Sequence, residues 1–252
     1  MSDADSRAAT GGPPPRWASD PVVATAARER APDASRVPAI VLGEGRPVPP
    51  LLGGSANPNS GGLYPLGRRY TIGDEATLEL SQLRGPANPH RYTLRVTRVD
   101  EANDRVELND GETVWDLMGN GVKVAGAVFD PPRQFVPAEL YVGRRWRAAF
   151  RGTQLVEDMR FKAGSERSVT VDIAIVARER IATPAGEFDA FRAQGYGTSG
   201  IHTLEERIWY VPYLNFPVRW DRWSHYYRGG HPTYGWANRR ELVSARQFAV
   251  GA

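Results

Sequence analysis

Gly143-Arg144-Arg145-Trp146 repeats the phrase Gly67-Arg68-Arg69-Tyr70, and a threonine-containing strand pattern follows each copy. The first of these patterns is Thr93–Val99 and the second is Thr170–Val176. Two aligned copies of one supersecondary unit indicate a fold built by duplication. The repeat is the strongest evidence for architecture in the sequence, and it carries no information about a reaction.

Hydrophobic residues alternate with polar or small ones in both of these strand patterns. From Val169 to Ile175 every second residue is Val or Ile, as in a strand with one buried face. Turn residues separate such strands, for example Asn109-Asp110-Gly111 and Pro184-Ala185-Gly186. Since no stretch after residue 64 offers three turns of amphipathic helix, we predict an all-β, antiparallel protein.

We expect two tandem meander units, residues 64–136 and 137–252, that form one curved sheet, a half-open barrel or a sandwich. The junction is placed at Asp130-Pro131-Pro132, because prolines interrupt strand pairing. Residues 1–63 are rich in Pro, Gly, Ala and Ser and cannot bury enough apolar surface to offset the entropy of ordering. They are predicted to be a disordered or extended arm, in which Val37–Leu42 could lie along a partner or along the body.

The composition narrows the possible functions. The chain of 252 residues has no cysteine, which excludes disulfides, thiolate catalysis and cysteine-based metal sites. Its net charge is +3, and its arginines stand beside acidic residues, as in Arg178-Glu179-Arg180, which predicts ion pairs on strand faces instead of a nucleic-acid interface. No apolar run approaches the roughly 20 residues that span a bilayer, and residues 1–30 lack the pattern of a signal peptide. We expect no nucleic-acid partner and no transmembrane segment.

A set of structural motifs runs through the second half of the chain. The motifs are Asp130–Pro132 followed by Leu140–Trp146, the hairpin Ile181–Arg192, the strand pair Ile208–Pro212 and Phe216–Trp220, and the closing strand Arg240–Ser244. These motifs and the sequence around them, residues 64–247 in all, resemble the TapB-like proteins and related bacterial β-rich envelope proteins of unknown function. This resemblance implies a periplasmic or envelope scaffold that holds a protein partner or an apolar ligand.

The hairpin motif has a plain physical basis. Pro184 presets the backbone dihedral of the turn, and Gly186 tolerates positive φ. Phe188 and Phe191 are then expected to anchor the outgoing strand in the core. The motifs specify shape, so the resemblance favours a noncatalytic scaffold or binding module without a cofactor.

The densest group of chemically informative residues is the aromatic segment Trp220–Trp236. Trp, Tyr and Arg dominate the energetics of binding interfaces. Strand alternation places Trp220 with Arg222 on one face and Trp223 on the other. Core packing of a curved sheet is the alternative explanation of these aromatics. The candidate binding residues are Trp220, Arg222, Trp223, Tyr226, Tyr227, Arg228 and Trp236.

A hydrolase or metal-dependent enzyme using Asp221, His225 and His231 is an alternative hypothesis. In that case His225 would take a proton from Ser224 and Asp221 would orient the imidazole. However, neighbouring residues of a strand point to opposite faces, and the two histidines would be about 20 Å apart on an extended strand, too far to share a metal. We therefore predict neither a catalytic residue nor a metal site. A metal site is conceivable if a loop at Gly229-Gly230 folds the two histidines together, with His202, Glu205 and Glu206 as further ligands.

A third hypothesis is an assembly subunit that docks onto a neighbour through residues 1–63, because Pro-rich arms can order on binding. Under this hypothesis the protein forms a homo-oligomer. The absence of a signal-peptide pattern leaves the cytoplasm open as a location beside the envelope.

Overall fold

The computed structural model describes most of the chain from residue 70 onward. The described residues are 38–42, 70–85, 88–137, 140–156, 162–200, 202–228 and 231–248, of which 38–42, 227–228 and 231–234 are described by their backbone alone. The predicted arm, apart from residues 38–42, lies outside the described residues.

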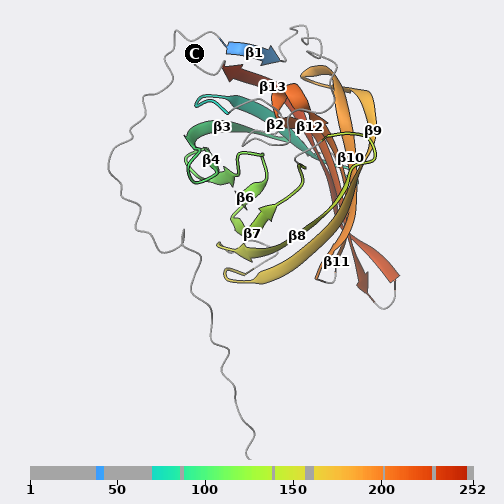
Figure 1. Cartoon of the computed structure of the whole chain (residues 1–252). Coiled ribbons are helices and arrows are strands. Elements are labelled where there is room, and N and C mark those ends of the chain that lie inside the picture. The colour runs from blue at the N-terminus through green and yellow to red at the C-terminus, as the bar shows by residue number, and fades with distance from the viewer. Residues whose placement is uncertain are drawn as a thin grey trace, which may run out of the picture. The chain divides into compact units, whose positions relative to one another are not determined.

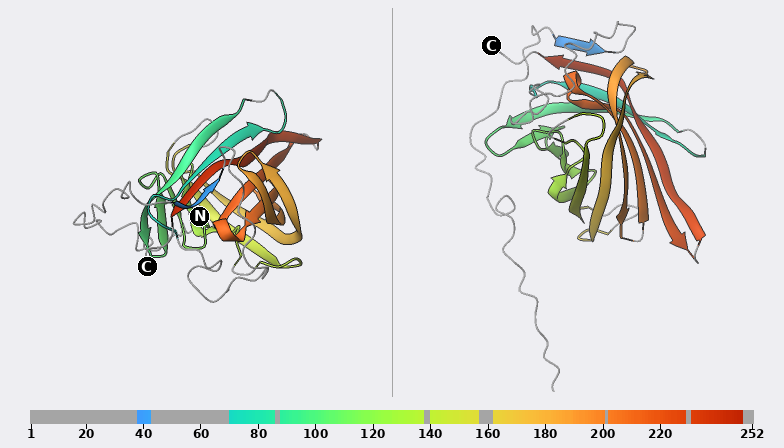
Figure 2. Two further views of the ribbon diagram at one scale, coloured as in Figure 1. Left: turned by 90° about the horizontal axis from the view of Figure 1, so that it is seen from above. Right: turned by 45° about the vertical axis from the view of Figure 1, so that its right-hand side comes forward.

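Strands β2 to β13 form a closed antiparallel barrel (Figure 1, Figure 2). Each strand pairs with its neighbours in sequence, and β13 also pairs with β2, so 12 of the 13 described strands belong to the ring. The short strands β4–β7 lie on the concave side of the long strands β8–β12 (Figure 1). The only described helix is the 3₁₀ turn η2 (Pro212–Leu214).

The strands have the following bounds in chain order: β1 (Pro38–Leu42), β2 (Glu75–Gln82), β3 (His90–Asp100), β4 (Arg105–Leu108), β5 (Thr113–Trp115), β6 (Gly121–Val124), β7 (Ala127–Arg133), β8 (Arg145–Gln154), β9 (Glu166–Thr183), β10 (Gly186–Ser199), β11 (His202–Val211), β12 (Phe216–Arg228) and β13 (His231–Phe248).

Closure of the ring depends on β13. Its first half pairs with β12, from His231 to Glu241. Its second half pairs with β2, with Asn238 opposite Gln82 and Arg246 opposite Glu75. The all-β, antiparallel prediction is confirmed. The predicted open curved sheet, half-open barrel or sandwich is wrong, because β13 is long enough to join both ends of the sheet.

The structure aligns the two copies of the repeat differently from the match between Gly67–Tyr70 and Gly143–Trp146. Gly143 occupies a turn before β8 with φ of 100°, and its amide donates to the carbonyl of Ile175 at 2.8 Å. Gly73 occupies the same turn before β2 with φ of 92°, and its amide donates to the carbonyl of Val96 at 2.8 Å. Such positive φ values favour glycine. The counterpart of Gly143 is therefore Gly73, and the match with Gly67 is out of register.

Strand β7 passes through the predicted junction. It includes Pro131 and Pro132, and its pairing with β8 stops at Asp130, opposite Arg151. Proline lacks the N–H that a sheet hydrogen bond needs, so pairing with β8 ends immediately before the two prolines. The prolines thus end one pairing without ending the strand. The division into units 64–136 and 137–252 stays a prediction.

Strand β1 adds a short segment to β13. Pro38 lies opposite Phe248, and Leu42 lies opposite Ala245. The segment Pro38–Leu42 therefore lies along the body of the protein, which is one of the two positions expected for it, the other being along a partner.

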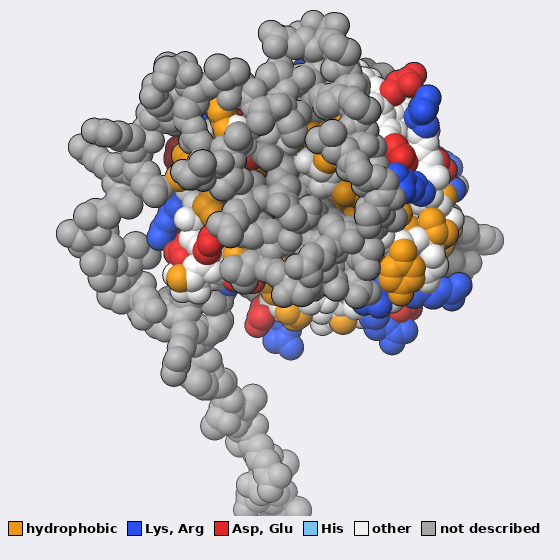
Figure 3. Space-filling model, turned by 45° about the horizontal axis from the view of Figure 1, so that its top comes forward, with side chains coloured by type: hydrophobic (Ala, Val, Ile, Leu, Met, Phe, Trp, Pro, Cys, Tyr) orange, Lys and Arg blue, Asp and Glu red, His pale blue; other side chains and the backbone are white. Residues whose placement is uncertain are grey.

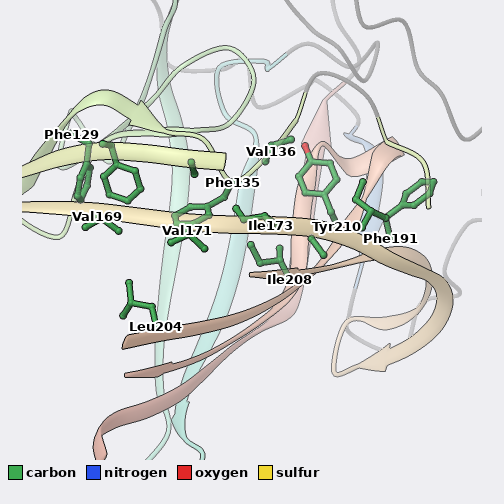
Figure 4. Packing of buried hydrophobic residues seen from close by; sticks show 14 of the residues in the cluster. Phe129, Phe135, Val136, Val169, Val171, Ile173, Phe191, Leu204, Ile208 and Tyr210 are labelled. Atoms are coloured by element: carbon green, nitrogen blue, oxygen red, sulfur yellow. The ribbon is translucent and has the colours of Figure 1, made fainter. Parts of the chain in front are cut away.

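Buried hydrophobic side chains form three clusters. The first, shown in Figure 4, gathers side chains of β7, β8, β10 and β11 around Val171 and Ile173 of β9. Phe188 and Phe191 are both buried, which confirms the predicted anchors, but they belong to different clusters. Since burial of one such side chain contributes about 1.5–3 kcal/mol, this hairpin stabilises two parts of the core.

Ion pairs join neighbouring strands on exposed faces, as predicted. Arg147 of β8 donates to both carboxylate oxygens of Asp172 on β9, and this hydrogen bonding holds the pKa of Asp172 below its usual range. Arg178 of β9 binds Asp189 of β10. On the described part of the face in Figure 3, acidic and basic side chains lie next to one another. Such pairs favour one strand register more than they add stability.

Alkaline pH is expected to destabilise the barrel through its tyrosines. Burial raises the pKa of Tyr213 from 10.0 to about 12, and burial also raises the pKa of Tyr92 and of Tyr210. As pH rises from 10.0 towards 12, the unfolded chain releases tyrosine protons that the folded protein keeps, so the free energy of unfolding falls. The melting temperature should therefore decrease across this range.

The variant Tyr213→Phe isolates one of these groups. Its hydroxyl has no hydrogen-bond partner among the described residues, so the melting temperature near neutral pH should change little. The alkaline decrease should become smaller, as measured by thermal denaturation followed by circular dichroism. An alkaline decrease equal to that of the wild type would contradict the assignment to Tyr213.

Candidate functional site

A partly open cavity of about 360 Å³ is lined by strands from several parts of the ring and by the loops between them. Ligand sites commonly occupy about 300–1,000 Å³, so the space is sufficient for a small ligand. Three charged residues, Arg133, Arg240 and Glu112, interrupt a lining that is otherwise mainly aromatic and aliphatic. The aromatic lining residues are Tyr70, Tyr92, Trp115, Phe135, Tyr210, Phe216 and Trp220.

Strand register places charged residues next to Trp220. On β12, Trp220 lies opposite Ile208 of β11 and Arg240 of β13. Arg222, on the same strand, lies opposite Glu206 of β11. Because alternate residues of a strand share a face, Trp220 and Arg222 lie on one face with these partners.

Three guanidinium groups surround the ring of Trp220. Arg133, Arg222 and Arg240 lie 5.4, 5.3 and 5.9 Å from its centroid. Phe135 meets the same ring edge-on at 5.2 Å, and Arg133 lies 4.7 Å from the centroid of Phe135. The aromatic faces thereby offset part of the cost of burying the cations. The term arginine cluster is used below for Arg133, Arg222, Arg240, Glu206 and Trp220.

Glu206 is the acidic member of the arginine cluster, and its side chain is 2% exposed. One oxygen, Oε2, accepts a hydrogen bond from Nε1 of Trp220 at 3.2 Å. The other, Oε1, accepts from Nε of Arg222 at 2.9 Å. Both carboxylate oxygens are therefore engaged inside the cluster. With one carboxylate for three guanidinium groups, the cluster has an excess of positive charge.

Burial and mutual repulsion disfavour the charged form of two of these arginines. Burial is the largest cause that lowers the pKa of Arg133 well below its usual value, followed by the charge of Arg222; Glu206 acts in the opposite direction. Burial also lowers the pKa of Arg240. The electrostatic environment at this end of the cavity would therefore be relieved by a negative charge.

Two hydrogen-bond donors of the arginine cluster are buried without a partner among the described residues. They are Nη2 of Arg133 and Nε of Arg240. A buried donor without a partner costs about 1–3 kcal/mol, and more when it belongs to a charged group. Native structures contain few such groups, and each calls for an explanation.

The structure brings together three of the candidate binding residues. Trp220 lines the cavity. Arg222 does not line it, but its guanidinium lies 5.3 Å from the ring centroid of Trp220 and 5.1 Å from that of Trp236. Trp236 is half-buried and packs against the first core cluster. All three come from the paired strands β12 and β13.

The other candidates lie elsewhere. Trp223, on the opposite face of β12, packs 4.8 Å from the guanidinium of Arg207. Tyr226 meets the ring of His202 edge-on at 5.7 Å. The side chains of Tyr227 and Arg228 lie outside the described residues.

Sequence reasoning missed Arg133 and Arg240 and considered Glu206 only as a metal ligand. These residues come from three strands, and only ring closure and strand register bring them to Trp220. One signal was available. Glu206 stands between Leu204 and Ile208, at the apolar positions of an alternating strand, where a charged residue is unusual.

Asp221 and Ser224 of the enzymatic hypothesis make contacts other than those proposed for them. Both carboxylate oxygens of Asp221 accept hydrogen bonds from Arg239, at 2.7 and 2.8 Å. The hydroxyl of Ser224 lies 3.3 Å from Nδ1 of His202. The side chain of His231 is not among those described. Asp221 thus serves a cross-strand ion pair, and Ser224 is matched with a histidine from another strand.

Two further findings concern the described residues alone. They contain no group of three His, Asp or Glu side chains close enough to hold a metal ion. None of their helices has the length and apolar character needed to cross a membrane.

Comparisons with known proteins give matches among solved structures. No protein-family model and no curated protein matches the chain. A protein from Bacteroides fragilis, described as exported and with a YmcC-like fold, aligns with 71% of this chain and 98% of its own, at 13% identity and a TM-score of 0.41. The hypothetical lipoprotein YmcC from Escherichia coli aligns with 67% of this chain and 83% of its own, at 11% identity and a TM-score of 0.38.

A third structure is described as a lipoprotein from Parabacteroides distasonis. It aligns with 70% of this chain and 96% of its own, at 15% identity and a TM-score of 0.32.

Proposed function

We propose that this protein is a noncatalytic binding module of the bacterial cell envelope that holds a largely apolar ligand inside its barrel. The cavity of about 360 Å³ is the observation that carries the proposal. Its lining is mainly aromatic and aliphatic with a few polar groups, which is the usual composition of a small-molecule site. The envelope location rests on the resemblance of residues 64–247 to TapB-like proteins.

Trp220 is the candidate residue proposed to contact the ligand directly, because its ring forms part of the cavity wall. Arg222 is proposed to support that ring, because its guanidinium contacts both Trp220 and Trp236. Trp223 and Tyr226, which do not line the cavity, are proposed to serve a protein partner or packing on another surface. Residues 1–63, apart from residues 38–42, which pair with β13, remain the segment proposed to dock onto a partner or a second copy.

Binding of an uncharged apolar dye tests the proposal. The fluorescence of N-phenyl-1-naphthylamine should increase when it enters the cavity, and Trp emission should change because Trp115 and Trp220 line the same space. The variant Thr113→Trp adds a large side chain to the cavity wall. It should weaken dye binding at least about tenfold while the protein stays folded, since the added ring occupies the space that the dye needs.

Thr153→Trp is the matched control. Thr153 lies on β8, is half-buried like Thr113 and does not line the cavity. Its variant should bind the dye as the wild type does, with folding of both variants checked by circular dichroism. If the folded wild type does not bind the dye, or if both variants bind it equally well, the cavity is not the binding site.

A further inference from the structure

The arginine cluster is more elaborate than an apolar ligand requires. An apolar ligand needs only the aromatic wall, yet three guanidinium groups lie beside it, and that of Arg133 is buried. Burying a charge is costly unless it is paired and hydrogen-bonded. Such a cluster therefore points to a ligand that compensates the charge.

The carboxylate of Glu206 does not provide that compensation alone. Its two oxygens are already bound by Arg222 and by the indole of Trp220. Arg133 and Arg240 thus remain with their charges only partly neutralised. Arg133 is 8% exposed, so water has little access to it.

Aromatic contacts leave the relevant donors free. Arg133 lies 5.4 Å from the ring centroid of Trp220 and 4.7 Å from that of Phe135, contacts that involve the aromatic π faces. The N–H groups of a guanidinium lie in its plane and form a fork that matches carboxylate or phosphate oxygens. The buried donors without partners among the described residues are of this in-plane kind, namely Nη2 of Arg133 and Nε of Arg240.

Both arginines line the same cavity as the aromatic wall. A ligand that fills this space therefore meets mainly apolar side chains and, beside Trp220, two guanidinium groups; the one acidic residue in the lining is Glu112. We propose that the bound ligand is an anionic amphiphile, whose carboxylate or phosphate oxygens bind Arg133 and Arg240 while its apolar chain packs against the aromatic wall. This inference rests on the proposed function, because it names the class of ligand for the same cavity.

Isothermal titration calorimetry of the full chain with four probes tests the inference. The probes are dodecanoate, dodecyl phosphate, dodecanol and inorganic phosphate. At least one of the two charged amphiphiles should bind at least about tenfold more tightly than dodecanol, since hydrogen bonds between ionised groups are about twice as strong as neutral ones. Inorganic phosphate should bind far more weakly than dodecyl phosphate, because it lacks the apolar chain.

Variants then assign the charge preference to the cluster. Arg240→Met and Arg133→Met replace a cation by an apolar side chain that can follow the same path. Each should reduce the preference for the charged amphiphiles over dodecanol at least about tenfold, while dodecanol still binds. Arg246→Met is the matched control, because Arg246 is also on β13 but its side chain is 51% exposed. It should bind all four probes as the wild type does.

The possible outcomes separate the two proposals. If dodecanol binds as tightly as both charged amphiphiles, the anionic headgroup is wrong and the apolar binding function stands. If inorganic phosphate binds as tightly as dodecyl phosphate, the cluster is a free-anion site and the amphiphile is wrong. If no amphiphile binds the folded protein, the proposed function and this inference fail together.

Discussion

Glu206→Gln is expected to lower the free energy of unfolding by about 3–5 kcal/mol, because it removes one partner of a buried charge pair. Glu206 is 2% exposed and is bound by Arg222, whose side chain is 17% exposed. Glutamine keeps the shape of the side chain and can still accept a hydrogen bond from Trp220. What disappears is the negative charge that faces three guanidinium groups. Urea denaturation followed by circular dichroism measures the loss.

Glu205→Gln is the matched control on the next residue of β11. Glu205 pairs with Arg207, and these side chains are 25% and 41% exposed. Such a pair contributes about 0–1 kcal/mol, so the control should lose little stability. Equal losses in the two variants would contradict the assignment of the effect to the buried charge.

A double variant separates lost charge balance from lost packing. Glu206→Met together with Arg222→Met removes both members of the pair and keeps apolar volume. Replacing a buried ion pair by hydrophobic residues is often neutral or stabilising, so the double variant should be more stable than Glu206→Gln. A double variant that is less stable than Glu206→Gln would show that packing dominates at this position.

Phe188→Ala is expected to lower the free energy of unfolding by about 3–5 kcal/mol, because it leaves a cavity where a large aromatic ring was buried. Phe188 is 2% exposed and belongs to the second core cluster, with Leu214 and Leu242. The cluster joins β10 to β13, so the loss should lower the midpoint of denaturant-induced unfolding. Denaturant titration of the wild type and the variant gives the difference.

Tyr196→Ala provides the comparison on the same strand. Tyr196 of β10 is 54% exposed, so removal of its ring should change stability by no more than about 0.5 kcal/mol. Comparable losses at the two positions would show that burial of Phe188 is not what stabilises this hairpin.

The strands and turns could be predicted from the sequence, because the residues within each of them determine its backbone conformation. The alternation from Val169 to Ile175 identified β9, and Asn109-Asp110-Gly111 marked a turn that the structure shows with positive φ at all three residues. Pro184 and Gly186 likewise identified the hairpin that buries Phe188. Each of these features depends on a few neighbouring residues.

Closure and the arginine cluster depend on residues far apart, and no local pattern reports them. Alternation shows that a strand has two faces, but it does not say which strands end up adjacent when the sheet curls. The contact of Arg133 with Trp220 needs β7 to face β12 across the ring. Likewise, Gly67-Arg68-Arg69 resembles Gly143-Arg144-Arg145 in sequence alone. The turn that is structurally equivalent to the one at Gly143 is at Gly73, as its backbone hydrogen bond shows.

The double role of β13 has a consequence for how the protein folds. Arg246 donates to Glu75, a contact between residues 171 positions apart in the chain. Contacts of such long sequence separation slow folding, because the chain loses entropy before they form. The ring cannot close until both β2 and β13 have been synthesised.

Until that moment β2 and β12 each present an unpaired edge, and such edges pair readily with other chains. The interval before β13 docks is therefore when the protein is most prone to aggregate, and a chaperone that shields strand edges would be most useful then.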